Sequence, residues 1–181
     1  MAAGVIILMG PTGAGKSFQA EQLAKQRGWA SISSGELLRA TTDPHIRAEL
    51  EAGELVETRS VEKLVETALR AVRDEQGIVL DGFPRELREA AWLSALLPQL
   101  HRDLEAVIYL EVPKSWALER LEKRKRSDDD RAAIEMKWHE YETETKPVIE
   151  HFQDLGKLHR IDGSGSQEVV ASLIAGVGTD G

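Results

Sequence analysis

Short apolar runs alternate along the chain with longer segments in which apolar residues recur at helical spacing. Residues 5–9 form an uninterrupted apolar run with turn residues behind it, the pattern of a fully buried strand. Residues 58–74 carry apolar side chains on one helical face, from Val61 to Val72. Short apolar strands that alternate with helices predict βαβ units and a parallel sheet covered on both faces. The expected strands are residues 5–9, 29–33, 77–80, 106–112 and 158–161.

The segments between these strands predict helices that end at recognisable residues. Residues 16–27 are followed by Gly28, and glycine commonly ends a helix. The turn Thr42-Asp43-Pro44 separates two short helices. A long helix over residues 131–154 is expected to be interrupted or bent near Pro147, which lacks the backbone N–H. The expected helices are residues 16–27, 34–39, 44–51, 58–74, 87–97, 113–123, 131–154 and 167–174.

The strongest chemical signal is the sequence GPTGAGKS at residues 10–17, a complete GxxxxGK[ST] pattern. It follows a predicted strand and opens a predicted helix, which is the context of a phosphate-binding loop. Glycine is needed because bare backbone must approach phosphate oxygens and donate several N–H groups to them. Lys16 adds a positive charge for the β- and γ-phosphates, and the Ser17 hydroxyl can ligate Mg²⁺. The alternative is a glycine-rich turn with an accidental lysine, and the flanking strand and helix count against it.

A second signal is Asp81, at the end of the apolar run of residues 77–80. An aspartate at the end of a buried strand beside a phosphate loop can organise Mg²⁺. The same residue could instead cap the helix that follows. The phosphate loop favours the metal role.

Composition and charge narrow the class of protein. The 181 residues fit one domain and contain no cysteine, so disulfides and thiolate metal sites are excluded. The formal charge of −8 argues against a nucleic-acid binder, which usually has a basic surface. No signal peptide and no apolar stretch of about 20 residues is found, so a cytoplasmic protein without a membrane partner is expected.

Five sequence blocks, in order, resemble the adenylate kinase family of nucleoside monophosphate kinases in its short-lid form. They are also similar to the UMP/CMP kinases. The blocks ISSGELLR at residues 32–39 and DGFPR at residues 81–85 carry the resemblance, since a phosphate loop alone is not specific. The remaining three blocks are residues 10–17, 53–56 and 120–145.

The resemblance implies both a fold and a reaction. The fold is α/β, a P-loop NTPase-type three-layer sandwich with a five-stranded parallel sheet. Residues 1–181 form one domain, with a flap for the monophosphate at about residues 34–64 and a short lid at about residues 123–131. The reaction is the reversible transfer of the ATP γ-phosphoryl group to a nucleoside monophosphate, with AMP expected, Mg²⁺ as cofactor and a monomeric enzyme.

The resemblance also assigns site residues, which fall into four groups. The catalytic group is Lys16, Arg85, Arg126 and Lys137, and the metal group is Ser17 and Asp81, partly through water. The ATP-binding group is Gly13, Ala14, Gly15, Lys16, Ser17, Phe18, Arg120, Arg124 and Gly165. The monophosphate-binding group is Ser34, Arg39, Glu54, Leu55, Val56, Gly82, Phe83, Pro84, Arg85 and Glu89. Independently of the resemblance, phosphoryl transfer needs positive charge around the phosphoryl oxygens, and these arginines supply it in an acidic chain.

Two positions depart from the family pattern. Lys137 stands where a second catalytic arginine is usual, and lysine keeps the charge but loses the bidentate fork. Glu89 stands where adenylate kinases have a glutamine that reads the AMP base. A carboxylate faces the adenine N1 lone pair, so it suits guanine better, or the N4 amine of cytosine. Alternatively, Glu89 points to solvent and pairs with Arg85 or Arg88.

These departures leave other functions open at the sequence level. The acceptor could be GMP, CMP or UMP. The protein could also be a catalytically weak nucleotide-binding regulator with the same fold, since Lys137 replaces an arginine. A P-loop kinase for another small acceptor is a further alternative, and the DGFPR block counts against it.

Overall fold

The computed structural model describes residues 3–51, 56–124 and 131–178, and within them five strands form one sheet. The sheet order is β2-β3-β1-β4-β5, and every neighbouring pair is parallel. The strands are β1 (Ala3–Met9), β2 (Ala30–Ser33), β3 (Ile78–Asp81), β4 (Arg102–Glu111) and β5 (Leu158–Asp162). The predicted all-parallel five-stranded sheet is thus confirmed.

The centre of the sheet is apolar on both faces, as a parallel sheet covered by helices requires. In β1 and β3, residues 5–8 and 78–80 are completely buried. Ile6 lies between Val79 of β3 and Ala106 of β4 in the register. The uninterrupted apolar runs therefore form the middle of the hydrophobic core.

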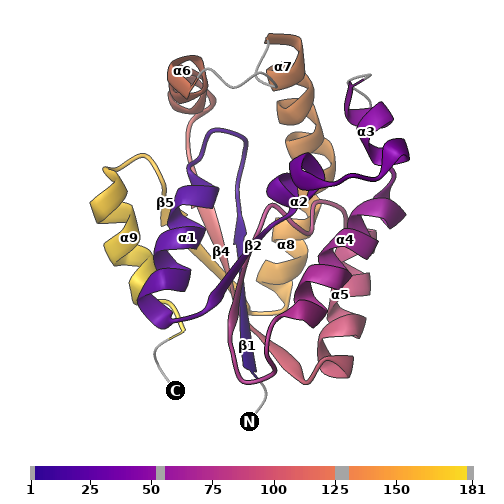
Figure 1. Ribbon diagram of the computed structural model, residues 1–181. Coiled ribbons are helices and arrows are strands. Elements are labelled where there is room, and N and C mark those ends of the chain that lie inside the picture. Colours follow the sequence, from indigo (N-terminus) through magenta and orange to yellow (C-terminus); the bar gives the residue numbers. More distant parts are fainter. Residues whose placement is uncertain (1–2, 52–55, 125–130, 179–181) are drawn as a thin grey trace.

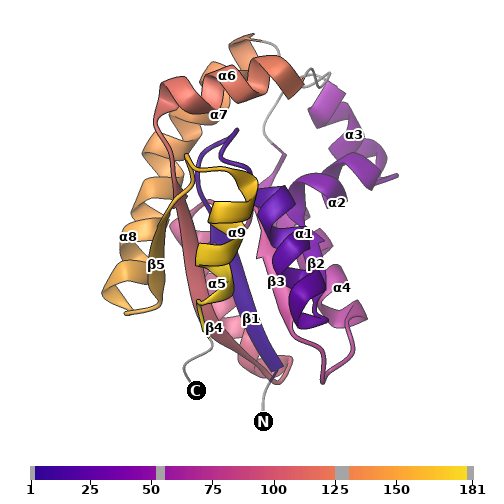
Figure 2. The ribbon, with the colours of Figure 1, turned by 90° about the vertical axis from the view of Figure 1, so that its left-hand side faces the viewer.

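Helices cover the sheet in two layers, which Figures 1 and 2 show from two sides. Helices α1 (Lys16–Arg27) and α9 (Gln167–Ala175) lie on one face. Helices α4 (Thr58–Ala71), α5 (Leu87–Gln99) and α8 (Lys146–Asp154) lie on the other. The molecule is therefore a three-layer α/β sandwich, as expected. None of the helices in the described ranges is both long enough and apolar enough to cross a membrane.

The remaining helices stand at the end of the sheet where the strands finish (Figure 1). Helices α2 (Ser34–Ala40) and α3 (Pro44–Glu51) follow β2, and α6 (Lys114–Arg124) and α7 (Arg131–Glu140) follow β4. In Figure 2 the loop after β1 lies between these two pairs. This end of the sheet is where ligands bind in open parallel sheets.

The long helix expected over residues 131–154 is interrupted close to Pro147, as predicted. A π-helical turn, η1 (Tyr141–Thr145), joins α7 to α8, and Lys146 donates its N–H to the carbonyl of Tyr141, five residues back. Pro147 is the second residue of α8 and has no backbone N–H to donate. The interruption is therefore a wide turn that ends two residues before the proline.

β4 begins at Arg102, four residues before the predicted start, because the side chain of that arginine is buried. Only 2% of Arg102 is exposed. Its guanidinium donates to the carbonyls of Gln76 (2.7 Å), Val72 (3.1 Å) and Arg73 (3.0 Å). Arg102 thus ties the connection between α4 and β3 to the start of β4.

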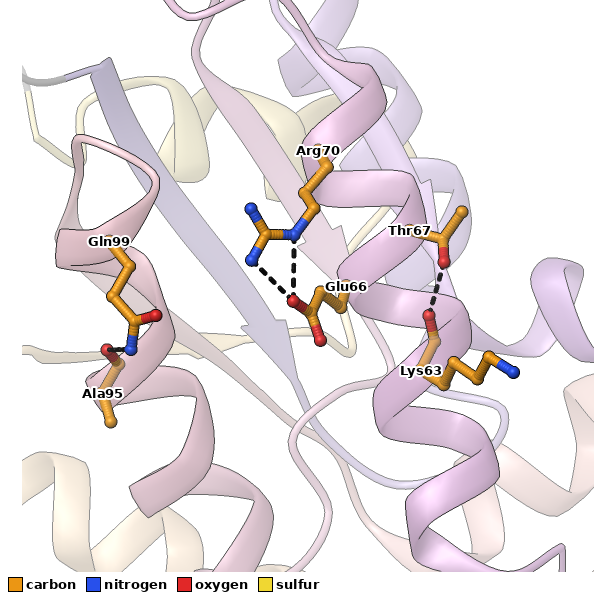
Figure 3. Close-up of polar contacts among 6 residues, drawn as sticks. All are labelled: Lys63, Glu66, Thr67, Arg70, Ala95 and Gln99. Carbon is orange, nitrogen blue, oxygen red and sulfur yellow. Dashed lines mark hydrogen bonds and ion pairs between the residues drawn. The ribbon is translucent and has the colours of Figure 1, made fainter.

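The solvent-facing side of α4 is held by contacts one helical turn apart, which Figure 3 draws. Arg70 donates to Oε1 of Glu66 through Nε (2.9 Å) and Nη2 (2.7 Å). Exposed pairs of this kind contribute about 0.3–0.5 kcal/mol. Figure 3 also shows that the Thr67 hydroxyl donates a hydrogen bond to the Lys63 carbonyl of α4. On α5, the Gln99 amide donates in the same way to the Ala95 carbonyl.

Candidate active site

The predicted phosphate loop connects β1 to α1, and its shape depends on glycine. Gly13 and Gly15 have φ of 85° and 90°, in the left-handed region that side chains disfavour. A Cβ at Gly13 would also lie 2.7 Å from the Ala117 carbonyl oxygen. The loop turns back on itself, since the Ala14 N–H donates to the Pro11 carbonyl at 3.2 Å. The bare backbone therefore arrives directly at the N-terminus of a twelve-residue helix, which favours anions.

Lys16 is the first residue of α1, and its side chain folds back over the loop. Its Nζ donates to the Pro11 carbonyl at 2.8 Å. The ammonium group therefore lies above the same loop whose backbone turns toward the helix. This geometry places a point charge where the loop would hold phosphate groups.

Asp81 receives two hydroxyl groups from different elements at the end of β3. Ser17 Oγ donates to Oδ2 of Asp81 at 2.7 Å, and Ser33 Oγ donates to the same oxygen at 3.1 Å. The side chain is buried, and among the described residues its Oδ1 has no hydrogen-bond partner. Asp81 does not cap the following helix, because α5 begins at Leu87 after Glu86. The capping alternative is therefore wrong.

A shallow hollow lies beside the phosphate loop. Arg120 stands at its edge, with its guanidinium 4.7 Å above the ring of Trp116. Phe18 is 37% exposed, which is unusual for an aromatic residue in a helix against the core. The predicted ATP-binding residues in the lining are Ala14, Gly15, Phe18, Arg120 and Gly165, and the residues that sequence reasoning missed are Gln19, Gly163, Gln167 and Val170.

The missed lining residues had a weak signal in the sequence. Gln19 follows Phe18 on α1, and its Nε2 donates to the Gln167 carbonyl at 3.0 Å. Gly163 lies two residues before the predicted Gly165. The polar Gln19 in the helix that follows the loop could have been noticed, whereas its hydrogen-bond partner Gln167, 148 residues later, could not.

The predicted acceptor residues meet at the carbonyl of Gly82, the residue after Asp81. Ser34 Oγ donates to this oxygen at 2.7 Å, and Arg85 Nε donates to it at 2.9 Å. Gly82 has φ of 75°, and a Cβ there would lie 2.9 Å from Ser34 Oγ. Glycine thus permits the close approach of α2 to the end of β3.

The other predicted acceptor residues surround this junction to different degrees. Arg39, exposed at the end of α2, folds back toward Gly35, where a Cβ would lie 3.3 Å from its Nη1. Val56 is half-buried before α4. Phe83 and Pro84 are buried, and the Phe83 ring meets Trp92 edge-on at 5.8 Å. Phe83 and Pro84 therefore anchor the segment that carries Arg85 to the interior of the protein.

Glu89 is buried and serves the backbone at the start of α5. Only 4% of it is exposed, and its Oε2 accepts the N–H of Arg85 at 2.6 Å and of Glu86 at 3.4 Å. Burial raises the pKa of the Glu89 carboxyl, and the hydrogen bond from the Arg85 backbone opposes this rise. The alternative that Glu89 points to solvent is therefore wrong. Its contact with an acceptor base stays a prediction.

Lys137 lies half-buried in the last turn of α7, and the structure adds a carboxylate beside it. Burial raises the pKa of Glu140, while the positive charges of Arg85 and Lys137 lower it. Oε1 of Glu140 is buried with no hydrogen-bond partner within the described ranges. Sequence reasoning missed Glu140, although its position three residues after Lys137 puts both on one helical face.

Some of the predicted site residues are not among those that the structure describes. Glu54, Leu55 and Arg126 are outside the described residues, and so is the side chain of Arg124, the last residue of α6. Their assigned roles therefore stay predictions.

Comparison with known proteins shows similarity across almost the whole chain. A family model described as adenylate kinase matches residues 8–157. The adenylate kinase of Synechococcus sp. (strain CC9311) is 38% identical over 178 residues, which are 95% of this chain and 97% of that protein. The adenylate kinases of a Prochlorococcus marinus strain and of Leptospira biflexa serovar Patoc (strain Patoc 1 / Ames) are 37% and 36% identical. Each covers 93% of this chain, with 95% and 96% of the relative aligned. The similarity thus extends far beyond a shared phosphate loop.

Proposed function

The chain belongs to the adenylate kinase family, and from this premise we propose how its residues divide the work of the reaction. It is a nucleoside monophosphate kinase that transfers the γ-phosphoryl group of ATP to AMP. One observation carries the proposed division. Asp81 accepts the hydroxyl of Ser17 on the phosphate-loop side, and the next residue, Gly82, accepts Ser34 and Arg85 on the other. Two consecutive residues thus join the proposed ATP and AMP sites.

On the ATP side, the loop of residues 10–15 and the N-terminus of α1 hold the β- and γ-phosphates through backbone N–H groups. Lys16 supplies the point charge, and to reach the phosphates it exchanges its contact with the Pro11 carbonyl for phosphate oxygens. The hollow lined by Phe18, Arg120 and Gly165 takes the adenine of ATP. An aromatic face and a guanidinium plane both stack favourably on a base.

The residues around Asp81 also fit Mg²⁺. Ser17 offers a hydroxyl ligand, and the buried Oδ1 of Asp81 offers an acceptor for a water of the ion. The described residues contain no cluster of three or more metal-binding side chains, which suits an ion held mainly by phosphates and water. Ser17 and Asp81 would hold Mg²⁺ at the phosphate loop, where the ion would supply positive charge to neutralise the charge that develops on the phosphoryl group.

On the AMP side, Arg39 and Arg85 grip the monophosphate. Nε of Arg85 is fixed by the Gly82 carbonyl, which leaves its two terminal nitrogens to form a fork for phosphate oxygens. Ser34, residues 54–56 and the segment 82–84 surround the nucleotide, and Glu89 lies at its base edge. The flap of residues 34–64 encloses this site.

Charge at the transferring group comes from Lys137 and from the lid of residues 123–131, which includes Arg124 and Arg126. Their task is to stabilise the negative charge on the equatorial oxygens and to exclude water. Lys137 provides a single point charge where a fork is usual, so it neutralises without fixing an orientation. Both sites belong to one chain, which supports a monomer, and the cytoplasm is proposed because both nucleotides are found there.

The test is an ADP-release assay with ATP and Mg²⁺ against AMP, GMP, CMP and UMP in parallel. We expect AMP to give the highest kcat/KM and expect removal of Mg²⁺ with a chelator to abolish turnover. A higher kcat/KM for GMP would overturn AMP as the acceptor. Binding of both nucleotides without ADP release would instead identify a regulator that has lost the chemistry.

A further inference from the structure

The main chain of Arg85 is held on both sides by other elements. Its N–H donates to Oε2 of Glu89 on α5 at 2.6 Å. Its carbonyl accepts the hydroxyl of Thr145 at 3.2 Å, from a residue 60 positions later in the chain. The first bond is local and belongs to the start of α5. The second joins the proposed AMP-binding arginine to the helix that follows the lid.

Thr145 lies where a helix anchored to the sheet meets the proposed AMP site. It is the last residue of the π-helical turn η1 and is 8% exposed. The first residue of that turn, Tyr141, shares a buried hydrogen bond with the Tyr109 hydroxyl of β4 at 2.6 Å. One end of the π turn is therefore anchored to the sheet, and its other end contacts Arg85.

The π turn also sets how residues before and after it project. Lys137 lies two turns before Thr145 on the same continuous helical path. A π turn holds one residue more than an α turn, so it rotates the residues after it relative to those before it. The direction of the Thr145 hydroxyl relative to Lys137 therefore differs from the one that an uninterrupted α-helix would give.

We propose that Thr145 is a positioning residue of the AMP site, which fixes the main chain of Arg85 and couples it to the helix that carries Lys137. The proposal rests on the proposed role of Arg85 as a phosphate-binding arginine. Without the hydroxyl, the Arg85 carbonyl loses its partner on the η1 side, and the guanidinium is less well oriented. The loss of one neutral hydrogen bond predicts roughly a threefold to tenfold weaker binding of AMP.

The decisive variant is Thr145→Val, which removes the hydroxyl and keeps the shape. Thr145→Ser keeps the hydroxyl and should therefore bind AMP as the wild type does. The matched control is Thr143→Val, because Thr143 lies in the same turn but is exposed and donates to the His139 carbonyl of its own helix (3.0 Å). Calorimetry gives Kd for AMP and ATP, and steady-state kinetics gives kcat and KM. We expect Thr145→Val to raise Kd and KM for AMP only, and Thr143→Val to change neither.

A double-mutant cycle with Arg85→Ala tests whether Thr145 acts through Arg85. If it does, Thr145→Val should have no further effect on AMP binding once Arg85 is removed. An equal loss in both backgrounds, an equal loss of ATP and AMP affinity, or an unchanged Kd for AMP would overturn the proposal. If Thr145→Val does not fold, Thr145→Ala is measured by the same criteria.

The same experiments separate this proposal from the proposed function. A wild-type protein without AMP turnover would overturn the function and this inference together. An Arg85→Ala variant with unchanged AMP affinity would overturn the role of Arg85 in the proposed AMP site and, with it, this inference. A functional wild type in which Arg85→Ala weakens AMP binding and Thr145→Val does not would overturn the inference alone.

Discussion

The phosphate loop and the acceptor arginine stand at the same end of the sheet but are built differently. The loop consists of consecutive residues, 10–17, and its shape follows from its own glycines and from the Lys16 contact with Pro11. Arg85 is positioned by contacts of two kinds. Its Nε and its N–H donate to Gly82 and Glu89, three and four residues away, and its carbonyl accepts the hydroxyl of Thr145, 60 residues later. The phosphate loop is therefore a local structure, whereas the position of Arg85 also depends on a tertiary contact.

This difference determines how each side should respond to substitution. In the loop, a single residue carries a function that no neighbour can replace. At the proposed acceptor site, two arginines would share the phosphate, and Arg85 is held by several contacts. Substitutions should therefore have the largest effects in the loop and graded effects around Arg85.

Lys16→Ala should have the largest effect. Removing the charge from the phosphate loop is expected to lower kcat by roughly 10²–10³-fold, the scale seen when a preorganised stabilising group is lost. The fold should persist, because the helix N-terminus and loop glycines are unchanged. The control is Lys25→Ala, an exposed lysine in the last turn of the same helix. Near-normal activity in a folded Lys16→Ala protein would contradict the ATP-site assignment.

Arg85→Ala and Arg39→Ala should each weaken AMP binding far more than ATP binding. A charge-assisted phosphate contact contributes about 1.5–3 kcal/mol, which corresponds to roughly a tenfold to hundredfold rise in Kd. Arg70→Ala is the matched control, since Arg70 is exposed on α4 and pairs only locally with Glu66 in Figure 3. Calorimetry that found equal losses for both nucleotides would remove the basis for two separate sites.

Glu89→Gln should have the smallest effect and should change selectivity. An amide can donate to adenine N1 and accept from N6, so kcat/KM for AMP is expected to rise and that for GMP to fall. The mismatch corresponds to about a tenfold change in preference. The glutamine oxygen can still accept the Arg85 N–H, so α5 should keep its start. Parallel kcat/KM measurements for AMP and GMP check this, with Glu66→Gln as the control. An unchanged ratio of the two kcat/KM values would mean that the backbone near Leu55 and Val56 recognises the base.

The sequence was sufficient for those parts of the fold that depend on local pattern. The strands in the sheet centre are continuous apolar runs, and the helices have clear periodicity and end signals, so element types and most boundaries were predicted. The start of β4 was missed because Arg102 is charged, and only its buried contacts with three carbonyls make it a core residue. The π turn was missed because a five-residue hydrogen-bond step has no signature in residue types.

The candidate site also contains parts that the sequence predicts and parts that it does not. The loop and Asp81 were predictable from spacing, since the strand, turn and helix are contiguous or follow from sheet order. The solvent-facing alternative for Glu89 was wrong, because its buried carboxylate accepts backbone N–H groups at the start of α5, whereas its contact with a base remains a prediction. Thr145 could not be found at all, because its only visible role is a contact with a carbonyl 60 residues away. Every residue has a main-chain carbonyl, so the sequence does not indicate which carbonyl accepts a hydrogen bond from a distant side chain.

The buried guanidinium of Arg102 has a mechanical consequence for the proposed flap. It clamps the carbonyls of Val72 and Arg73, which directly follow the last residue of α4. Val65 and Leu69 of the same helix are buried in the core, so the C-terminal half of α4 is held along its side by the core and at its end by Arg102. Closure of the proposed flap over AMP would therefore have to move residues that precede this half of the helix. The arginine that joins the end of α4 to the start of β4 thus sets where the moving part of the flap can end.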